Sequence, residues 1–407
     1  MGLTEPDGAS MRRNHSRDLR RAQNSHYAPN KMIIFTKMLK IGIECENLED
    51  AKSRWGVGHL VLNLLKEYAT NPEYQKKVKL YLYFKSKIPS DVFLQNPIFV
   101  KKVLKLPFVN SFNLFYHIMM PLRAMLDRVD MIFFPSYNLP PLYFGKSIVM
   151  LTPDVYYEYK TGTLPFKYKL AYRLFSNWAA KKATKILAIS EASKKELIKL
   201  YGVTADRIFV AKLGVSPKDR DKRQETSPYV LFVGQMFPRR RAAETLLAFK
   251  TITPDFPDMK FILIGKDKYN PPIIAELVKK INEELGGKRI IHHEYIESDA
   301  EVVDLYRNAK LFIYISSSEA FGLPPVEAAS YGVPVVVKDC ELNHELFGDA
   351  AFFVKNEYGI DGIADAIKDG LTNTEKRNYC LQKYKELTPK LNWRNFADNF
   401  FKACENY

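Results

Sequence analysis

The sequence has few cysteines and no long uninterrupted hydrophobic run. Its 407 residues include four cysteines, scattered without the spacing of metal ligands: Cys45, Cys340, Cys380 and Cys404. So few cysteines in so long a chain argue against a disulfide framework and fit a reducing, cytoplasmic compartment. The most apolar stretch, residues 131–144, is interrupted by three prolines, so the sequence predicts no membrane-spanning helix.

The length and the pattern along the chain predict two α/β domains. The first 37 residues contain no apolar segment long enough for a signal peptide, and we expect a disordered basic extension or a start codon placed too far upstream. Beyond them, short β-branched or aromatic runs alternate with helical periods, which is typical of βαβ units. We expect an N-terminal domain over residues 38–215, a linker over 216–228, a second domain over 229–385 and a crossover helix over 386–407.

The expected strands are short apolar runs, and those of the two domains form two series. They cover residues 39–45, 78–84, 129–134, 147–151, 185–189 and 207–212 in the first series, and 229–233, 260–264, 289–293, 311–315 and 334–337 in the second.

Positive charge is concentrated in the first half of the chain. The net charge is +15, but residues 1–215 hold 34 Lys plus Arg against 17 Asp plus Glu, while the remainder holds 27 against 29. A solvated lysine-rich surface and a surface that meets an anionic partner both explain this excess. Residues 99–108, where three lysines stand among apolar side chains, suggest an anionic membrane surface or a lipid-linked acceptor. They could equally form an ordinary helix with a wet face, and no recognised nucleic-acid-binding motif occurs.

The most informative stretch is SSSEAFGLPPVEAA at residues 316–329, directly after an expected buried strand. Pro324 and Pro325 suit the first turn of a helix, where a missing N–H costs nothing. A helix start attracts an anion such as a diphosphate through its free amides. The amides expected to point out of this helix start are those of Phe321, Gly322 and Leu323.

Two carboxylates, Glu319 and Glu327, are separated by seven residues in this stretch. Hydroxyl groups are natural partners for carboxylates, so we expect Glu319 to hold a sugar and Glu327 a ribose. As an isolated pair, Glu319 could instead be a dipole partner of the helix and Glu327 a surface residue.

A second informative stretch is YVLFVGQMFPRRR at residues 229–241. Three arginines at the start of an expected helix are electrostatically unfavourable without an anion, which favours a binding site over a solvated basic surface. A guanidinium group such as that of Arg240 can bind a phosphate group in a bidentate manner.

Both stretches closely resemble the retaining glycosyltransferases of family 4, with the E-x7-E motif. The resemblance implies the GT-B fold, in which two Rossmann-like domains face each other across a cleft and a C-terminal helix crosses back to the first. It also implies transfer of a mannose-like hexose from a GDP- or UDP-sugar to a glycan or lipid-linked acceptor, in the synthesis of a cell-surface polysaccharide or glycolipid. No cofactor and no metal are expected.

The resemblance assigns roles to residues at matching positions. The catalytic group is Arg240, Arg239, Glu319 and Asp154; the donor-binding group is Gly56, Gly58, Gly234, Phe321, Gly322, Leu323, Glu327, Tyr295 and Ile296; His59 is a candidate for the acceptor.

Two departures from the family pattern leave alternatives open. Pro153 stands where the family has a histidine, so either Asp154 or Tyr156 contacts the sugar, or the donor lacks the hydroxyl that the histidine recognises. Gln235 stands at a commonly basic position, which leaves Arg239 or Arg241 to supply the second positive charge. His59 could be a packed side chain. A nucleotide-sugar epimerase, a non-catalytic sugar-nucleotide binder and a nucleic-acid-binding protein are the rival functions, and the Asp-x-Asp at 219–221 is a weak metal candidate.

Overall fold

The structure, a computed structural model, is described over most of the chain beyond residue 37. The described residues are 38–50, 54, 56–105, 111–160, 162, 164–215, 228–355 and 359–406. Contacts group Met38–Tyr407 as one unit. None of the described helices combines the length and the apolar character needed to cross a membrane.

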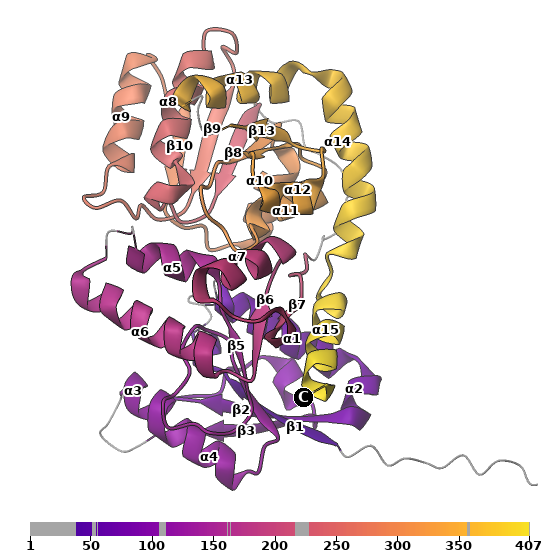
Figure 1. Cartoon of the computed structure of the whole chain (residues 1–407). Helices are drawn as coiled ribbons and strands as arrows, with labels where there is room; N and C mark the ends of the chain where they lie inside the picture. The colour runs from indigo at the N-terminus through magenta and orange to yellow at the C-terminus, as the bar shows by residue number, and fades with distance from the viewer. Residues whose placement is uncertain are drawn as a thin grey trace, which may run out of the picture. The chain divides into compact units, whose positions relative to one another are not determined.

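Among the described residues, two parallel sheets organise the molecule (Figure 1). The first has seven strands in the order β3-β2-β1-β4-β5-β6-β7, and the second has six in the order β10-β9-β8-β11-β12-β13. The strands of the first are β1 Leu39–Glu44, β2 Val78–Phe84, β3 Phe99–Val103, β4 Met131–Phe134, β5 Ser147–Met150, β6 Lys185–Ala188 and β7 Ile208–Val210. Those of the second are β8 Tyr229–Val233, β9 Lys260–Ile264, β10 Ile290–His293, β11 Leu311–Tyr314, β12 Val335–Lys338 and β13 Phe352–Val354.

Helices connect the strands of each sheet. Those of the first half are α1 Val57–Thr70, α2 Pro72–Lys77, α3 Phe112–Leu114, α4 Met120–Leu126, α5 Pro153–Lys160, α6 Phe166–Lys182 and α7 Glu191–Tyr201. Those of the second are α8 Ala242–Ile252, α9 Ile274–Glu284, α10 Asp299–Asn308, α11 Leu323–Ser330, α12 Glu341–Phe347, α13 Gly359–Thr372, α14 Thr374–Leu387 and α15 Trp393–Glu405. Shorter segments are η1 Glu46–Leu48, η3 Val92–Gln95, the π-helical turn η4 Phe115–Met119, η5 Ala205–Arg207, η6 Pro238–Arg240 and η8 Thr388–Lys390.

The central strands are buried on both faces, as parallel strands between helices must be. Every residue of β4 and of β8 is buried.

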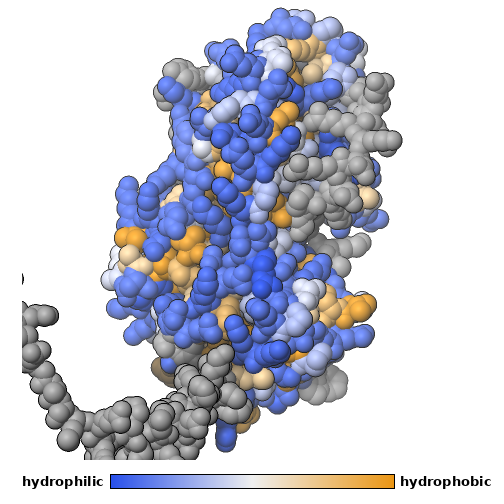
Figure 2. Space-filling view, turned by 90° about the vertical axis from the view of Figure 1, so that its right-hand side faces the viewer, coloured by the Kyte–Doolittle hydropathy of each residue, from blue (hydrophilic) through white to orange (hydrophobic). Residues whose placement is uncertain are grey.

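One face of the molecular surface is largely hydrophilic, and hydrophobic side chains gather on it in separate patches (Figure 2).

The eleven expected strands are all confirmed, and two further strands occur that the sequence pattern did not predict. Both lie at an edge of a sheet: β3 pairs with β2, and β13 pairs with β12. The alternative that residues 99–108 form an ordinary helix with a wet face is wrong for the described part, because Phe99–Val103 is a strand at the edge of the sheet, where Lys101 and Lys102 are half-buried. Charged residues protect such edges from pairing with another chain, and they also weaken the apolar period of the strand. Phe108 lies outside the described residues.

The C-terminal helix α15 crosses back to the first sheet, as expected. The ring centroids of Phe400 and of Phe133 in β4 lie 4.8 Å apart. The hydroxyl of Tyr68 in α1 donates to the carbonyl of Ala397 at 3.5 Å.

A buried carboxyl group, Glu44, ends the central strand β1. It is 1% exposed, and its Oε1 accepts a hydrogen bond from the amide of Glu46 at 2.7 Å. Burial raises the pKa of Glu44 from its ordinary value of 4.5 to about 8. Folding therefore keeps on this carboxyl group a proton that the unfolded chain releases above pH 4.5.

We expect the replacement Glu44→Gln to stabilise the protein at neutral pH. The contribution of Glu44 to stability is complete below its unfolded pKa and falls by about 1.4 kcal/mol per pH unit as the pH rises toward the folded value. Glutamine keeps the acceptor oxygen but cannot ionise, so the free energy of unfolding should vary less with pH. Denaturant titrations at several pH values between 5 and 8 measure this, and parallel profiles for the two proteins would contradict it.

Candidate functional site

A glycine turn after β8 places the arginines predicted to bind the donor. Gly234 has a φ of +141°, and a Cβ added there would lie 3.1 Å from Nη1 of Arg240. The chain then forms η6 and reaches Arg241, whose φ of +52° places it in the left-handed region before α8. The arginines therefore belong to a tight turn that precedes the helix, rather than to its first turn.

Arg240 forms an ion pair with Glu319, which lies between β11 and α11. Its Nε donates to Oε1 at 2.7 Å and its Nη2 to Oε2 at 3.3 Å. Each side chain is 15% exposed. The hydroxyls of Tyr314 and Ser316 also donate to Oε1 of Glu319, at 3.1 and 3.0 Å.

The pair keeps both of its members charged. Burial alone would raise the pKa of Glu319, but the Arg240 guanidinium outweighs burial and lowers it. Burial likewise opposes the charge of Arg240, yet the Glu319 carboxylate raises the pKa of Arg240 above its ordinary value. The negative charge of Asp154 also raises the pKa of Arg240, so this predicted site residue lies near the guanidinium group.

Arg239 binds both the loop before α11 and the first half of the chain. Its Nε donates to the carbonyl of Ser318 at 3.2 Å, and its Nη1 pairs with Glu158 of α5 at 2.9 Å. Its own carbonyl accepts from the amide of Ser317 at 2.8 Å. Both predicted arginines are thus in contact with the loop that carries Glu319.

The start of α11 has the predicted form. Gly322 precedes the helix with a φ of +82°, in the left-handed region that favours glycine, and prolines occupy the first turn. The first amides of a helix have no hydrogen-bond partner within the helix, so the start of α11 has N–H groups that can donate to another group.

Helix α7, in the first half of the chain, contacts the loop that carries Glu319. The hydroxyls of Ser190 and Ser193 donate to the carbonyl of Ala320 at 2.9 and 2.7 Å. The carboxylate of Glu345 in α12 accepts from the amides of Glu191 and Ala192 at 3.0 and 2.8 Å. Ser190 also caps α7 by accepting a hydrogen bond from the amide of Ser193, and these contacts fix the position of the loop between the two halves.

The second predicted glutamate has a different partner from the first. Glu327 lies in the second turn of α11, and its Oε2 accepts from the hydroxyl of Tyr306 in α10 at 3.0 Å. Burial raises the pKa of Glu327. Tyr295 and Ile296, between β10 and α10, are respectively 45% exposed and packed against the core.

The predicted residues of the first half have mixed environments. Gly56 caps α1 with a φ of +55°, and Gly58 is buried in the first turn. The ring of His59 packs against Trp393 at 5.6 Å, and burial lowers the pKa of His59, so this ring is neutral and packed. Asp154 has a buried Oδ1 without a hydrogen-bond partner among the described residues.

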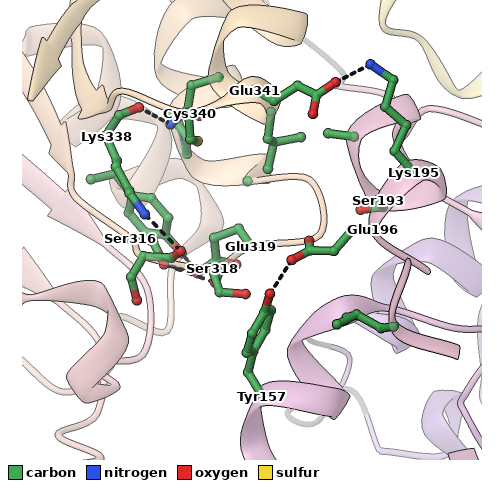
Figure 3. Close-up of a pocket in the computed structure, with 18 of the residues that line it drawn as sticks. Tyr157, Ser193, Lys195, Glu196, Ser316, Ser318, Glu319, Lys338, Cys340 and Glu341 are labelled. Atoms are coloured by element: carbon green, nitrogen blue, oxygen red, sulfur yellow. Dashed lines mark hydrogen bonds and ion pairs between the residues drawn. The ribbon is translucent and has the colours of Figure 1, made fainter. Parts of the chain in front are cut away.

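A cavity of about 530 Å³ lies beside Glu319. Its lining combines residues of α5 and α7 with the β11–α11 loop and the start of α12. Figure 3 shows Glu319 and Ser318 on the loop side and Glu196 and Lys195 facing them from α7. Lys195 pairs with Glu341, and the hydroxyl of Tyr157 donates to Glu196. The lining of the cavity holds three lysines and three glutamates: Lys195, Lys199, Lys338, Glu196, Glu319 and Glu341.

No group of three or more His, Cys, Asp or Glu side chains that could hold a metal occurs in the described part of the chain. The Asp-x-Asp at residues 219–221 lies outside that part. The ring Nε2 of His292 in β10 lies 2.8 Å from the carbonyl oxygen of Gly265.

Four further residues contact the predicted site residues. Glu158 binds Arg239, Tyr306 binds Glu327, and Tyr314 and Ser316 bind Glu319. Of these four, only Ser316 and Tyr314 lie close in sequence to the residue that they contact, three and five residues before Glu319.

Comparisons with known proteins show which proteins this chain resembles. Residues 216–387 match the family described as Glycosyl transferases group 1. The chain is 29% identical over 232 residues to the O-antigen chain mannosyltransferase B of Escherichia coli, covering 54% of this chain and 59% of that protein. The match therefore spans less than two thirds of that relative.

Solved structures share the fold. WaaG, a glycosyltransferase involved in lipopolysaccharide biosynthesis, gives a TM-score of 0.66 at 15% identity, covering 90% of this chain and 98% of that one. HepE of Anabaena in complex with UDP-glucose gives 0.65 at 16% identity, covering 91% and 100%. The chain thus has the two-domain GT-B fold, and its residues 216–387 match the group 1 glycosyl transferases.

Proposed function

We propose that this protein is a retaining glycosyltransferase that moves a mannose-like hexose from a nucleotide-diphosphate sugar to a glycan or lipid-linked acceptor. The observation that carries the proposal is the convergence of Arg239 and Arg240 on the loop that joins Glu319 to the start of α11. Fixed positive groups on one side and backbone donors on the other form a site for a pyrophosphate.

The present partners of the arginines support an anion at this site. Arg239 contacts the carboxylate of Glu158, and Arg240 contacts that of Glu319. A diphosphate would replace Glu158 at the guanidinium of Arg239, since both are anions that accept paired hydrogen bonds. Glu319, which remains ionised, would hold hydroxyls of the donor sugar, and Glu327 would hold those of the ribose.

The cavity beside Glu319 offers a place for the acceptor sugar. Its carboxylates, hydroxyls and lysines suit a ligand with many hydroxyl groups, and Glu319 and Gly322 connect it to the donor site. Asp154 would contact the transferred sugar through its unpaired Oδ1.

The proposed reaction breaks the bond between the anomeric carbon and the diphosphate oxygen and forms one to the acceptor oxygen on the same face of the sugar. Negative charge gathers on the departing diphosphate, whose oxygen takes the proton of the acceptor hydroxyl. Arg240, Arg239 and the amides at Gly322 and Leu323 would stabilise this charge in place of a metal.

We propose the donor and the pathway from the names of similar proteins. The E. coli relative is named as an O-antigen chain mannosyltransferase, and HepE was solved with UDP-glucose. We therefore propose a GDP- or UDP-hexose as donor, and cytoplasmic synthesis of a cell-surface polysaccharide or glycolipid, at the inner face of the membrane.

A thermal-shift panel of GDP-, UDP- and ADP-sugars tests donor binding, since a ligand that binds only the folded state raises its stability. Release of nucleoside diphosphate that depends on added acceptor, measured with EDTA present, then tests transfer. An epimerase would change the sugar without an acceptor, and a non-catalytic binder would show the thermal shift without release. Either result would overturn the proposal.

A further inference from the structure

Helix α6 carries a stripe of large apolar side chains that faces water. Phe166, Leu170, Leu174 and Trp178 recur every four residues and therefore lie on one face of the helix. Their exposed fractions are 79%, 43%, 60% and 36%. The residues that α6 buries are small: Ser176, Ala179 and Ala180. This orientation is the reverse of an ordinary surface helix, whose large apolar face packs on the core.

A second exposed apolar surface lies on the neighbouring helix α4. Leu122, Met125 and Leu126 of α4 are 56%, 65% and 77% exposed. The rings of His117, in the turn before α4, and Phe175 of α6 stack at 5.5 Å, which places the two segments side by side (Figure 1). We call these surfaces together the α4–α6 face. Monomeric soluble proteins rarely expose so extended an apolar patch unless it binds something.

The charge along α6 is positive. Residues 159–190 contain no Asp or Glu and seven basic residues: Lys160, Lys167, Lys169, Arg173, Lys181, Lys182 and Lys185. Residues 111–126, which end with α4, also contain no Asp or Glu, and Asp127 directly after α4 pairs with Arg123. The ammonium group of Lys182 lies over the ring of Trp178 at 5.6 Å, so a cation stands beside an apolar anchor. Aromatic and aliphatic side chains framed by lysines are typical of helices that lie in the interface of an anionic bilayer.

We propose that the α4–α6 face docks this protein onto the surface of an anionic lipid bilayer. A second copy of the chain is a poorer occupant, because it would bring the same positive charges against this face. The docking surface is thus α4 and α6, rather than residues 99–108.

The position of α6 connects docking to the candidate site. Helix α6 packs against α5, which carries Asp154 and Glu158. Glu158 in turn binds Arg239. Docking would hold the site close to a lipid-linked acceptor, and this use of the surface rests on the proposed function, whereas docking itself does not.

Flotation of the full chain with vesicles tests the proposal. We expect flotation with vesicles containing about 30% phosphatidylglycerol, weaker flotation with phosphatidylcholine alone, and release as salt rises. The double variant Phe166→Glu/Leu174→Glu should lower partitioning about 100-fold or more, since it puts acids into the apolar stripe. Both side chains are more than half exposed, so the fold should tolerate the change.

The control is Val92→Glu, which places one acid at a residue of η3 that is 77% exposed, in a segment that contacts α1. It should float like the unaltered protein. Equal flotation of the double variant, or no flotation of the unaltered protein, would overturn the proposal. So would a dimer by light scattering that the double variant abolishes, because a second copy would then cover the face. If nucleotide sugars fail to bind while flotation behaves as described, the proposed function fails and docking stands.

Discussion

Replacing Arg240 with alanine is expected to lower the rate of sugar transfer by about 100-fold or more, the typical loss when one group that stabilises transition-state charge is removed. Arg240 is the cation in closest contact with Glu319, with Nε and Oε1 2.7 Å apart. No metal is proposed to share its work, so the variant should lose much of the stabilisation of the departing diphosphate. Steady-state release of nucleoside diphosphate with saturating acceptor measures the loss.

The neighbouring Arg241 provides a matched control. It belongs to the same turn but pairs with Glu244 at 3.4 Å, and asparagine tolerates its left-handed backbone. Arg241→Asn should therefore transfer sugar at close to the normal rate. A melting curve shows whether Arg240→Ala, which leaves Glu319 without its cation, still folds. Near-normal turnover in a folded Arg240→Ala protein would contradict the role assigned to this arginine.

Replacing Glu319 with glutamine is expected to reduce turnover about 100-fold while affecting nucleoside diphosphate binding only slightly. The side chain keeps its shape but loses the charge that binds Arg240 and that we assign to the donor sugar. A free nucleoside diphosphate has no sugar to contact this residue, so its affinity should change little.

Glu327→Gln is the contrast to this variant. Glu327 lies on α11 against Tyr306, and we assign it to the ribose. Its loss should weaken nucleotide binding more than it slows the bound complex. Titration calorimetry of both variants with the nucleoside diphosphate separates the two roles. If Glu319→Gln loses nucleotide affinity as strongly as Glu327→Gln, the assignment of the sugar to Glu319 is wrong.

Much of the fold was predictable because its signals are local. Buried parallel strands are continuous apolar runs, and β8 and β11 are examples that the sequence marks clearly. The start of α11 was equally clear, since prolines and a glycine each have a defined place there. Strand β3 was missed because its sequence, FVKKV, contains lysines that belong to a sheet edge.

The partners in the site could not be predicted, because the sequence does not state which distant groups meet. Arg239 and Glu158 are 81 residues apart, and Glu327 and Tyr306 are 21 apart. The structure also shows how Gln235 contacts the site: its backbone carbonyl accepts a hydrogen bond from Nη1 of Arg240 at 2.8 Å. Its position thus supports the arginine without a basic side chain. The orientation of α6 is a further case, since an apolar stripe in a sequence indicates a core face unless coordinates place it in water.

Calorimetric titration of nucleotide sugars, with EDTA present, tests the central claim that Arg239 and Arg240 hold the donor diphosphate. The account predicts that a GDP- or UDP-hexose binds the unaltered protein without metal. It also predicts that Arg239→Ala/Arg240→Ala weakens this binding by at least about tenfold, equivalent to about 1.4 kcal/mol. Equal affinity of the folded double variant, or binding by the unaltered protein only when a divalent metal is added, would contradict it.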